Sequence, residues 1–329
     1  MQFFRLTRRI AIGACVFLAA AGMAHAQTAA HAYPTKPVTI MVGFGPGSGT
    51  DILARIIAEE LRQALGQTFV VVNRPGASAA IAAEAVAKAA PDGYTLFITS
   101  NSSHSVNPHL QKSLRYDPQK DFTAVGRIAD FPFVLVVDPK LPIRTPQELV
   151  AYVRARPGAV SYAYGNTPGQ VAGAALAKLM NLQVTAVPYK SSPPAMADVA
   201  AGQEAFMVVD LASSKAFVSA GRLRAIAVTT STRSALAPEL PSLGEELGLT
   251  GFDLRAWTGM FGPAGMPRAI TERLNAELLK ILAQPELRTR LLAGNMEPTP
   301  APTAEFERFL AEQYVVWGRK IKEAGIEPE

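Results

Sequence analysis

The part of the sequence best suited to bind an anion is a glycine-rich stretch, Gly43-Phe44-Gly45-Pro46-Gly47-Ser48-Gly49-Thr50-Asp51. It lies between a predicted strand and a predicted helix. Its four glycines allow backbone N–H groups to turn toward one point, and the N-terminal end of the helix adds positive potential. A tight turn in which Asp51 only caps the helix would give the same pattern. The stretch therefore indicates either an anion site without a charged side chain or an ordinary turn.

This first loop does not match the common nucleotide-binding patterns. A phosphate-binding loop needs a lysine before its helix, and the stretch has none. A dinucleotide-binding loop needs a third glycine three places after the second, where this sequence has Ser48 or Thr50. The sequence therefore argues against a nucleotide.

Two further loops have the same position between a strand and a helix. Asn73-Arg74-Pro75-Gly76-Ala77-Ser78 follows the second strand, and Gly165-Asn166-Thr167-Pro168-Gly169-Gln170 repeats the layout later in the chain. Either one alone reads as an ordinary turn. One glycine-rich loop in each half of the protein, however, suits a carboxylate held between the two halves.

Residues that could support catalysis are few. His104 and His109 share a polar stretch with several serines, and their spacing without an intervening acid is a weak metal pattern. No Gly-x-Ser-x-Gly turn follows a strand, although Ser48 or Ser102 near His104 leaves a small hydrolase as an alternative. Asp210 follows an apolar run, where it could hold water or an amine or cap the next segment.

The elements that would position these loops form two similar blocks. Strands at 38–42, 69–72 and 94–99 alternate with helices at 51–65 and 79–90, which predicts a parallel sheet covered by helices. Strands at 160–164 and 184–187 enclose a helix at about 169–180, and apolar strands are predicted at 133–137 and 205–209. Ligands of such sheets bind at the carboxyl ends of the strands. We therefore expect two α/β lobes with a cleft between them.

The N-terminal residues predict export. Arg5, Arg8 and Arg9 precede the apolar run Ile10 to Met23, and Ala24-His25-Ala26 offers a cleavage site, so residues 1–26 are expected to be a signal peptide. An uncleaved anchor is the alternative, and the general and twin-arginine export routes both stay open. Cys15 is the only cysteine and lies in this segment, which excludes disulfides and thiolate chemistry in the mature chain.

Charge also limits the possible partners. The chain has 32 basic and 27 acidic residues, and removal of the three arginines leaves a nearly balanced mature protein. No long basic run is present, so nucleic acid is not an expected partner. No later apolar stretch reaches the length of a membrane span, so we expect the mature protein to be soluble.

In its sequence motifs the chain resembles the substrate-binding receptors of tripartite tricarboxylate transporters, the Bug receptor family. The resemblance covers nearly the whole mature chain, from about Tyr33. The motifs that carry it are Tyr33-Pro34-x-Lys36-Pro37-Val38, Pro46-Gly47-x-x-x-Asp51-x-x-Ala54-Arg55, Asn73-Arg74-Pro75-Gly76-Ala77, Pro91-Asp92-Gly93-Tyr94-Thr95-Leu96, Tyr116-Asp117-Pro118, Val187-Pro188-Tyr189-Lys190, Pro241-Ser242-Leu243-x-Glu245-Glu246 and Pro263-x-Gly265-x-Pro267.

The resemblance implies an α/β, two-lobed type II periplasmic-binding-protein fold (Venus flytrap) with a mostly parallel sheet in each lobe. Lobe 1 is expected at 27–125 and 231–329, and lobe 2 at 126–230. A ligand carboxylate would be held by backbone amides, hydroxyls and ordered waters. The expected ligand-binding residues are Phe44, Ser48, Thr50, Asp51, Ala77, Ser78, Ser102, Gly165, Asn166, Thr167 and Asp210.

The sequence departs from the family pattern at four positions in or near the loops that would hold the ligand. Ser48 replaces a glycine of the first loop, Pro168 and Val171 replace a serine and a histidine in the second-lobe loop, and Ser191 replaces a glycine after Tyr189-Lys190. Pro168 removes an N–H group that could reach the ligand. These changes leave the identity of the ligand open.

Together these features predict a periplasmic solute-binding protein that captures a small carboxylate for the membrane permease subunits of a tripartite transporter. We expect a monomer that is not an enzyme and has no cofactor or metal. A ligand sensor for a membrane signalling partner is the main alternative, and a small secreted hydrolase is another.

Overall fold

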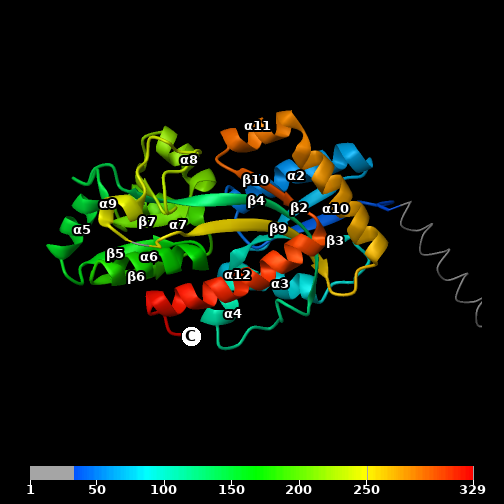
Figure 1. The fold of residues 1–329 in the computed structure, drawn as a ribbon, viewed down its shortest axis with the longest axis horizontal. Coiled ribbons are helices and arrows are strands. Elements are labelled where there is room, and N and C mark those ends of the chain that lie inside the picture. The colour runs from blue at the N-terminus through cyan, green and yellow to red at the C-terminus, as the bar shows by residue number, and fades with distance from the viewer. Residues whose placement is uncertain (1–32, 250, 329) are drawn as a thin grey trace, which may run out of the picture.

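The computed structural model describes residues 33–249 and 251–328, so the predicted signal peptide lies outside the described residues. The strands join into one sheet whose main path runs β2-β1-β3-β9-β4-β7-β5-β6, with β8 and β10 each paired to β4. Helices cover this sheet in two lobes that lie side by side (Figure 1). The two-lobed α/β fold predicted from the sequence is confirmed.

The first lobe is built on the parallel strands β2, β1 and β3. Strand β1 (Val38–Val42) lies between β2 (Phe69–Asn73) and β3 (Thr95–Ser100) and pairs with both in parallel. Helix α2 (Gly49–Leu65) connects β1 to β2, and the short turn η1 (Ala77–Ala79) with helix α3 (Ala80–Ala87) connects β2 to β3. The predicted strand and helix order is therefore confirmed for this block.

The second lobe repeats this arrangement. Strand β5 (Val160–Tyr164) pairs in parallel with β6 (Val184–Pro188) and β7 (Phe206–Asp210). Helices α6 (Thr167–Leu179), α7 (Ser192–Ala200) and α8 (Leu211–Ser219) each begin directly after one of these three strands or its short loop. Their N-terminal ends consequently meet at one edge of the sheet.

A single long strand connects the lobes. Strand β4 (Phe122–Val137) pairs antiparallel with β9 (Arg255–Pro263) through residues 122–132, and with β7 and β8 (Arg224–Val228) through residues 133–137. Pro132 and Phe133 therefore mark the crossing. The sequence predicted only the second part as a strand, because Gly126, Arg127 and Asp130 interrupt the apolar pattern of the first part.

The chain returns to the first lobe close to this point. Leu254 N–H donates to the carbonyl of Thr229, and Thr229 N–H donates to the carbonyl of Phe133, at 3.1 and 3.0 Å. Helix α9 (Leu243–Leu247) packs on α5 (Pro146–Arg154) of the second lobe. The lobe boundaries at 126 and 231 stay a prediction, and from these pairings we propose crossings after Pro132 and near Leu254.

The C-terminal elements close the first lobe and reach the second. Helices α10 (Arg268–Ala283) and α11 (Pro285–Ala293) precede β10 (Glu297–Ala301), which pairs with β4. Helix α12 (Thr303–Ala324) packs along the first lobe and contacts α6 of the second lobe (Figure 1). It therefore connects the lobes outside the sheet.

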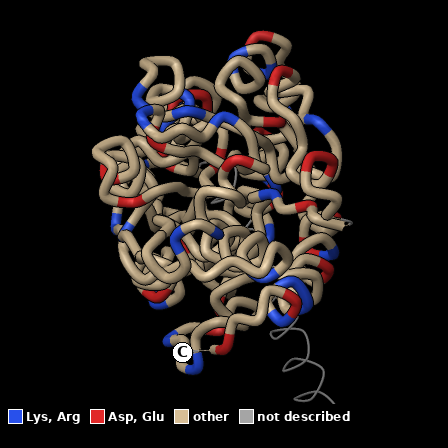
Figure 2. The backbone as a smooth tube through the Cα atoms, turned by 90° about the vertical axis from the view of Figure 1, so that its left-hand side faces the viewer, with Lys and Arg blue, Asp and Glu red and all other residues tan. Residues whose placement is uncertain are grey.

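Acidic and basic residues are interspersed over the backbone and form no single basic stripe in the view of Figure 2. Among the helices of residues 33–249 and 251–328, none is both long and apolar enough to cross a membrane.

Candidate functional site

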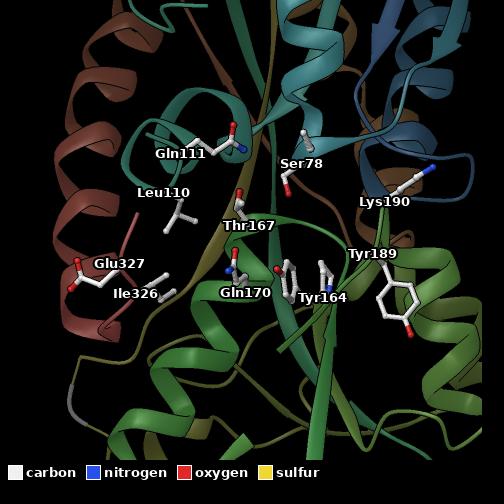
Figure 3. Close-up of a pocket in the computed structure, with 12 residues that line it drawn as sticks. Ser78, Leu110, Gln111, Tyr164, Thr167, Gln170, Tyr189, Lys190, Ile326 and Glu327 are labelled. Atoms are coloured by element: carbon white, nitrogen blue, oxygen red, sulfur yellow. The ribbon is translucent and has the colours of Figure 1, made fainter. Parts of the chain in front are cut away.

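Two cavities lie where the lobes meet. The inner cavity is narrow, with a volume of about 20 Å³, whereas the outer cavity has a volume of about 320 Å³. The inner one is lined by Phe44, Ser48, Gly49, Thr50, Ser100, Asn101, Phe131, Phe133, Asn166, Pro168, Ser192, Asp210 and Ala256. The outer one is lined by Ala77, Ser78, Leu110, Gln111, Tyr164, Thr167, Gln170, Pro188, Tyr189, Lys190, Ile326 and Glu327 (Figure 3).

The N-terminal ends of four helices border the inner cavity. Its lining includes Ser48, Asn166 and Asp210, which cap α2, α6 and α8, and Ser192, which is the first residue of α7. Each end carries the equivalent of about half a positive charge. Among the described residues that line this cavity, none is a lysine or an arginine. The positive potential at the inner cavity therefore comes from peptide dipoles.

Three N–H groups of the first loop already have partners. Gly47 N–H donates to Asp51 Oδ2 at 3.0 Å, and Asp51 N–H donates to Ser48 Oγ at 3.3 Å. Gly49 N–H donates across the cleft to Ser213 Oγ at 2.7 Å. In this arrangement these groups bind protein oxygens, so they do not form the open cluster that the glycine spacing suggests.

Asp51 lines neither cavity. Its carboxylate accepts hydrogen bonds from Asn73 Nδ2 at 2.8 Å and from Arg55 Nε at 3.1 Å, besides the one from Gly47. Asn73 Nδ2 also donates to the carbonyl of Phe44 at 2.9 Å. The structure thus places Asp51 as the group that holds the first loop in shape, 2% exposed and away from the cavity space.

Asp210 and Gly49 bring the two lobes into direct contact. Asp210 Oδ2 accepts from the hydroxyl of Ser213 and Oδ1 from its N–H, both at 2.7 Å. A Cβ atom at position 49 would lie 2.4 Å from Asp210 Oδ1, so only glycine fits there. Burial raises the pKa of Asp210 above its usual range, because desolvation penalises the charged form.

The second loop is backbone-strained and lines the outer cavity. Ala77, Ser78 and Ala79 all have positive φ, at 45, 48 and 74°, and such strain is concentrated at functional sites. Asn107 Nδ2 donates to the carbonyl of Ser78 at 3.0 Å, and Asn107 Oδ1 accepts from Thr167 Oγ1 at 2.9 Å. Asn107 therefore connects this loop to the second lobe.

The floor of the inner cavity comes from the end of β3. Ser100 and Asn101 line it, and Asn101 Nδ2 donates to the carbonyl of Arg255 at 3.1 Å. Asn101 Oδ1 is buried without a hydrogen-bond partner. Ser102, predicted to contact the ligand, lies behind this floor, fully buried, and accepts from Ser100 Oγ at 3.2 Å.

The second-lobe loop divides between the two cavities. Asn166 lines the inner cavity and Thr167 the outer one. Gly165 lines neither, because its backbone packs against Ser192, whose N atom would lie 2.2 Å from a Cβ at position 165. Of the predicted residues, Phe44, Ser48, Thr50, Asn166 and Asp210 meet at the inner cavity, and Ala77, Ser78 and Thr167 meet at the outer one.

The set of ligand-binding residues predicted from the sequence lacks eight residues that line the inner cavity and nine that line the outer one, and five of the inner ones are the most informative. Ser100, Asn101 and Ser192 stand at the ends of strands β3 and β6, where the rule that ligands bind at strand ends could have found them. Phe131 and Phe133 enclose the cavity from the crossing of β4. That position follows from strand pairing, and no local pattern indicates it.

The residues considered for hydrolysis do not form a catalytic arrangement. His104 Nδ1 lies 2.9 Å from Ser103 Oγ, not from Ser102, and its ring stacks on Phe261 at 3.9 Å. Burial lowers the pKa of His104 to about 3, so the ring is neutral at physiological pH. Ser48 Oγ accepts the capping bond of α2. Within residues 33–249 and 251–328 no cluster of three or more His, Cys, Asp or Glu side chains could hold a metal.

The sequence is similar to a known receptor family over most of its length. Residues 53–326 match the model of the tripartite tricarboxylate transporter family receptor. Protein BugT of Bordetella pertussis (strain Tohama I) is 34% identical over 325 residues, which cover 97% of this chain and 98% of that protein.

Solved structures of the same kind share the fold. R. palustris Rpa4515 with adipate has a TM-score of 0.88 at 34% identity and covers 90% of this chain and 100% of its own. The periplasmic binding protein BugD has a TM-score of 0.85 at 30% identity, with 90% and 100% covered. MatC from Rhodopseudomonas palustris with bound malate has a TM-score of 0.82 at 30% identity, with 88% and 100% covered.

Proposed function

The chain belongs to the tripartite tricarboxylate transporter receptor family, and from this premise we propose that it captures a small carboxylate between its lobes for the permease subunits of such a transporter. Members of this family are periplasmic solute-binding receptors and not enzymes. The ligand, the contact residues and the membrane partner are the parts that we propose.

The observation that supports a carboxylate most directly is the convergence of four helix N-termini on the inner cavity. Helices α2, α6, α7 and α8 have 17, 13, 9 and 9 residues, long enough for their dipoles to matter. Each dipole stabilises a nearby anion by about 0.3–1 kcal/mol, and up to about 2 kcal/mol when partly buried. A carboxylate at this point would gain from all four.

Asp210 opposes this attraction when it is ionised. Because burial raises its pKa, protonation is easier than for an exposed aspartate. A protonated Asp210 would remove the repulsion and could donate to a carboxylate oxygen. An ionised Asp210 would instead favour a ligand that carries a hydroxyl or an amine beside its carboxylate, as malate carries a hydroxyl.

Capture requires that the lobes open. The bond from Gly49 to Ser213 and the bond from Thr167 to Asn107 both join groups from different lobes, so opening breaks them. A ligand at the inner cavity would add its own contacts to these bonds in the closed form. Closure is therefore stabilised by bonds that exist only when the lobes meet.

The outer cavity would hold the distal end of a longer ligand. In Figure 3, Ser78 of the first lobe faces Thr167 and Tyr164 of the second, and Lys190 and Glu327 lie at opposite ends. A dicarboxylate with one end at the helix N-termini would direct its other end toward Lys190. The two structures with adipate and malate bound belong to relatives whose ligands carry two carboxylates.

The direct test is a thermal-shift screen of the chain without residues 1–26 against mono-, di- and tricarboxylates, with the matching neutral amides as controls. A true ligand raises the melting temperature with increasing concentration, since a ligand at 100 times its Kd adds about 2.7 kcal/mol of stability. Absence of a shift with every carboxylate, or equal shifts with the amides, would falsify the proposal.

The membrane partner needs a second experiment. Purified permease subunits should retain the ligand-saturated receptor more strongly than the ligand-free receptor. If the permease subunits retain both forms equally, delivery to a permease is contradicted. If the ligand-saturated receptor binds a membrane signalling protein in their place, the sensor alternative is supported.

A further inference from the structure

A third cavity lies behind the crossing strands, on the side away from the ligand cleft. Its volume is about 340 Å³, and it is formed by β4, β9, α12 and the segment before β9. Ala256 lines both this rear cavity and the inner cavity. Asp130 lines the rear cavity and its neighbour Phe131 the inner one, as expected for side chains that alternate across a strand. Only the thickness of the sheet separates the two cavities.

Two residues that line the rear cavity each carry a buried donor for which the described residues provide no acceptor. Trp257 is 2% exposed, and its Nε1–H has no hydrogen-bond partner. Arg127 Nε–H has none either, although Nη2 of the same side chain donates to both carboxylate oxygens of Asp130 at 2.7 and 2.6 Å. Buried donors without acceptors are destabilising and rare in native proteins. Two of them in one cavity indicate that an acceptor is missing there.

The charges around the cavity point to the same conclusion. Arginines at 127, 255 and 319 and a lysine at 320 face only two acidic lining residues, Asp130 and Asp253. Both acids already pair with a lining arginine, Asp253 with Arg255 at 3.2 Å and Asp130 with Arg127. Glu323, outside the lining, approaches Arg319 at 3.8 Å. Lys320 Nζ donates to the carbonyl of Asp253 at 2.5 Å. The cavity lining still carries four cationic side chains against two acidic ones.

The walls of the cavity are aromatic. Trp257, Phe309 and Trp317 all line it, and Trp257 meets Phe309 edge-on with ring centroids 5.7 Å apart. The ring of Phe309 lies over the Arg127 guanidinium at 3.7 Å. Such walls suit a ring or a short aliphatic body attached to the charged group.

We propose that the rear cavity is a second ligand site, for a small carboxylate on a ring or short aliphatic body. The carboxylate oxygens accept from Trp257 Nε1 and Arg127 Nε, with Lys320 at the rim. Because both donor nitrogens are covered in this arrangement, the guest must displace a side chain, and Phe309 is the one that covers Arg127.

The chain carries its own reporter for this site. Its two tryptophans, Trp257 and Trp317, both line the rear cavity. Titration with cyclohexanecarboxylate should therefore change the tryptophan fluorescence saturably, whereas cyclohexanecarboxamide, with the same body and no charge, should not. The change should persist in Gly49→Ala, which obstructs only the ligand cleft.

Two variants locate the effect. Trp257→Phe removes one orphan donor, retains an aromatic side chain and leaves Trp317 as the reporter, and Lys320→Met removes the rim charge and keeps the apolar stem. Each should weaken binding about tenfold, the lower range for a hydrogen bond to a charged group. Tyr152→Phe removes a polar group from an aromatic ring of the second lobe and is the matched control, with unchanged affinity.

Four results would overturn the second site. These are no saturable change with the carboxylate, an equal change with the amide, affinity within about twofold of the parent in both Trp257→Phe and Lys320→Met, and loss of the response in Gly49→Ala. A crystal structure at saturating carboxylate with only water on the two donors would overturn it as well.

Discussion

Replacement of Gly49 by alanine separates closure of the lobes from stability of the fold. The added Cβ would lie 2.4 Å from Asp210 Oδ1, 3.1 Å from its Cγ and 3.5 Å from Ala212 Cβ in the second lobe. Ordinary contacts of a Cβ atom begin at 3.4 Å, so the lobes must separate by roughly 1 Å at this point. The bond from Gly49 N–H to Ser213 Oγ, now 2.7 Å, would then be stretched or lost.

The magnitude follows from this geometry. Loss of one hydrogen bond that involves a charged network costs about 1.5–3 kcal/mol, so ligand affinity should fall by about 10- to 150-fold. The stability of the ligand-free protein should not fall, because Gly49 is the first residue of α2 and alanine favours the helix by up to about 1 kcal/mol. An open form relieves the clash entirely.

The assay is titration calorimetry of the variant with the best ligand from the thermal-shift screen, beginning with adipate and malate. Gln63→Ala, on the exposed side of the same helix, is the control and should bind as the parent does. Thermal melts without ligand should give the same or a slightly higher melting temperature for Gly49→Ala. Unchanged affinity would refute the reasoning, since it would mean that the ligand-bound lobes do not bring the first loop against Asp210.

Four other variants test separate parts of the structure. Asp210→Asn should abolish an increase in ligand affinity that the parent shows as the pH is lowered below neutral, because burial raises the pKa of Asp210 and protonation removes a negative charge from the cavity; calorimetry at a series of falling pH values checks it, and a parallel pH dependence in both proteins contradicts it. Asn107→Ala breaks the bridge between the lobes and should weaken binding by about 5- to 10-fold, mostly through faster dissociation in stopped-flow traces. Lys190→Gln should lower the affinity for an extended dicarboxylate by no more than about fivefold, because Lys190 is exposed, and should leave the affinity for a monocarboxylate unchanged. Gly173→Ala places a Cβ 2.3 Å from the ring of Tyr162 and should destabilise the second lobe by about 1–3 kcal/mol in denaturant melts, with no effect expected from an alanine at the exposed Gln63.

The ligand cavities lie at the ends of strands, where capping residues are easy to recognise in the sequence. Some of the predicted residues line a cavity in the structure, and others face their own lobe. Ser48, Asn166 and Asp210 were identified because each directly precedes a helix and a capping side chain leaves a recognisable local pattern. Asp51 has the same local appearance but points to Asn73 and Arg55 of its own lobe. Spacing along the chain cannot distinguish these two orientations.

Two aromatic residues of the inner cavity could not be predicted from local sequence patterns either. Phe131 and Phe133 line the inner cavity because β4 changes its partner strand between them, from β9 to β7 and β8. Local periodicity predicts a strand at 133–137 but does not predict which strands it joins. The first half of β4 has no such local pattern, since its polar residues Arg127 and Asp130 also depend on tertiary contacts, with Phe309 and Thr299 respectively.

The sequence by itself determined the two strand and helix blocks and the loops at their strand ends, because periodicity, glycines and helix caps act over a few neighbouring residues. The resemblance to the receptor family rests instead on its motifs. Only the tertiary structure decided which loop atoms meet. Gly49 and Ser213 form their bond across 164 residues of chain, and the orphan donors of Arg127 and Trp257 share a cavity only because β4 and β9 lie side by side. Hydrogen bonds and burial depend on distance in space, which local sequence does not encode.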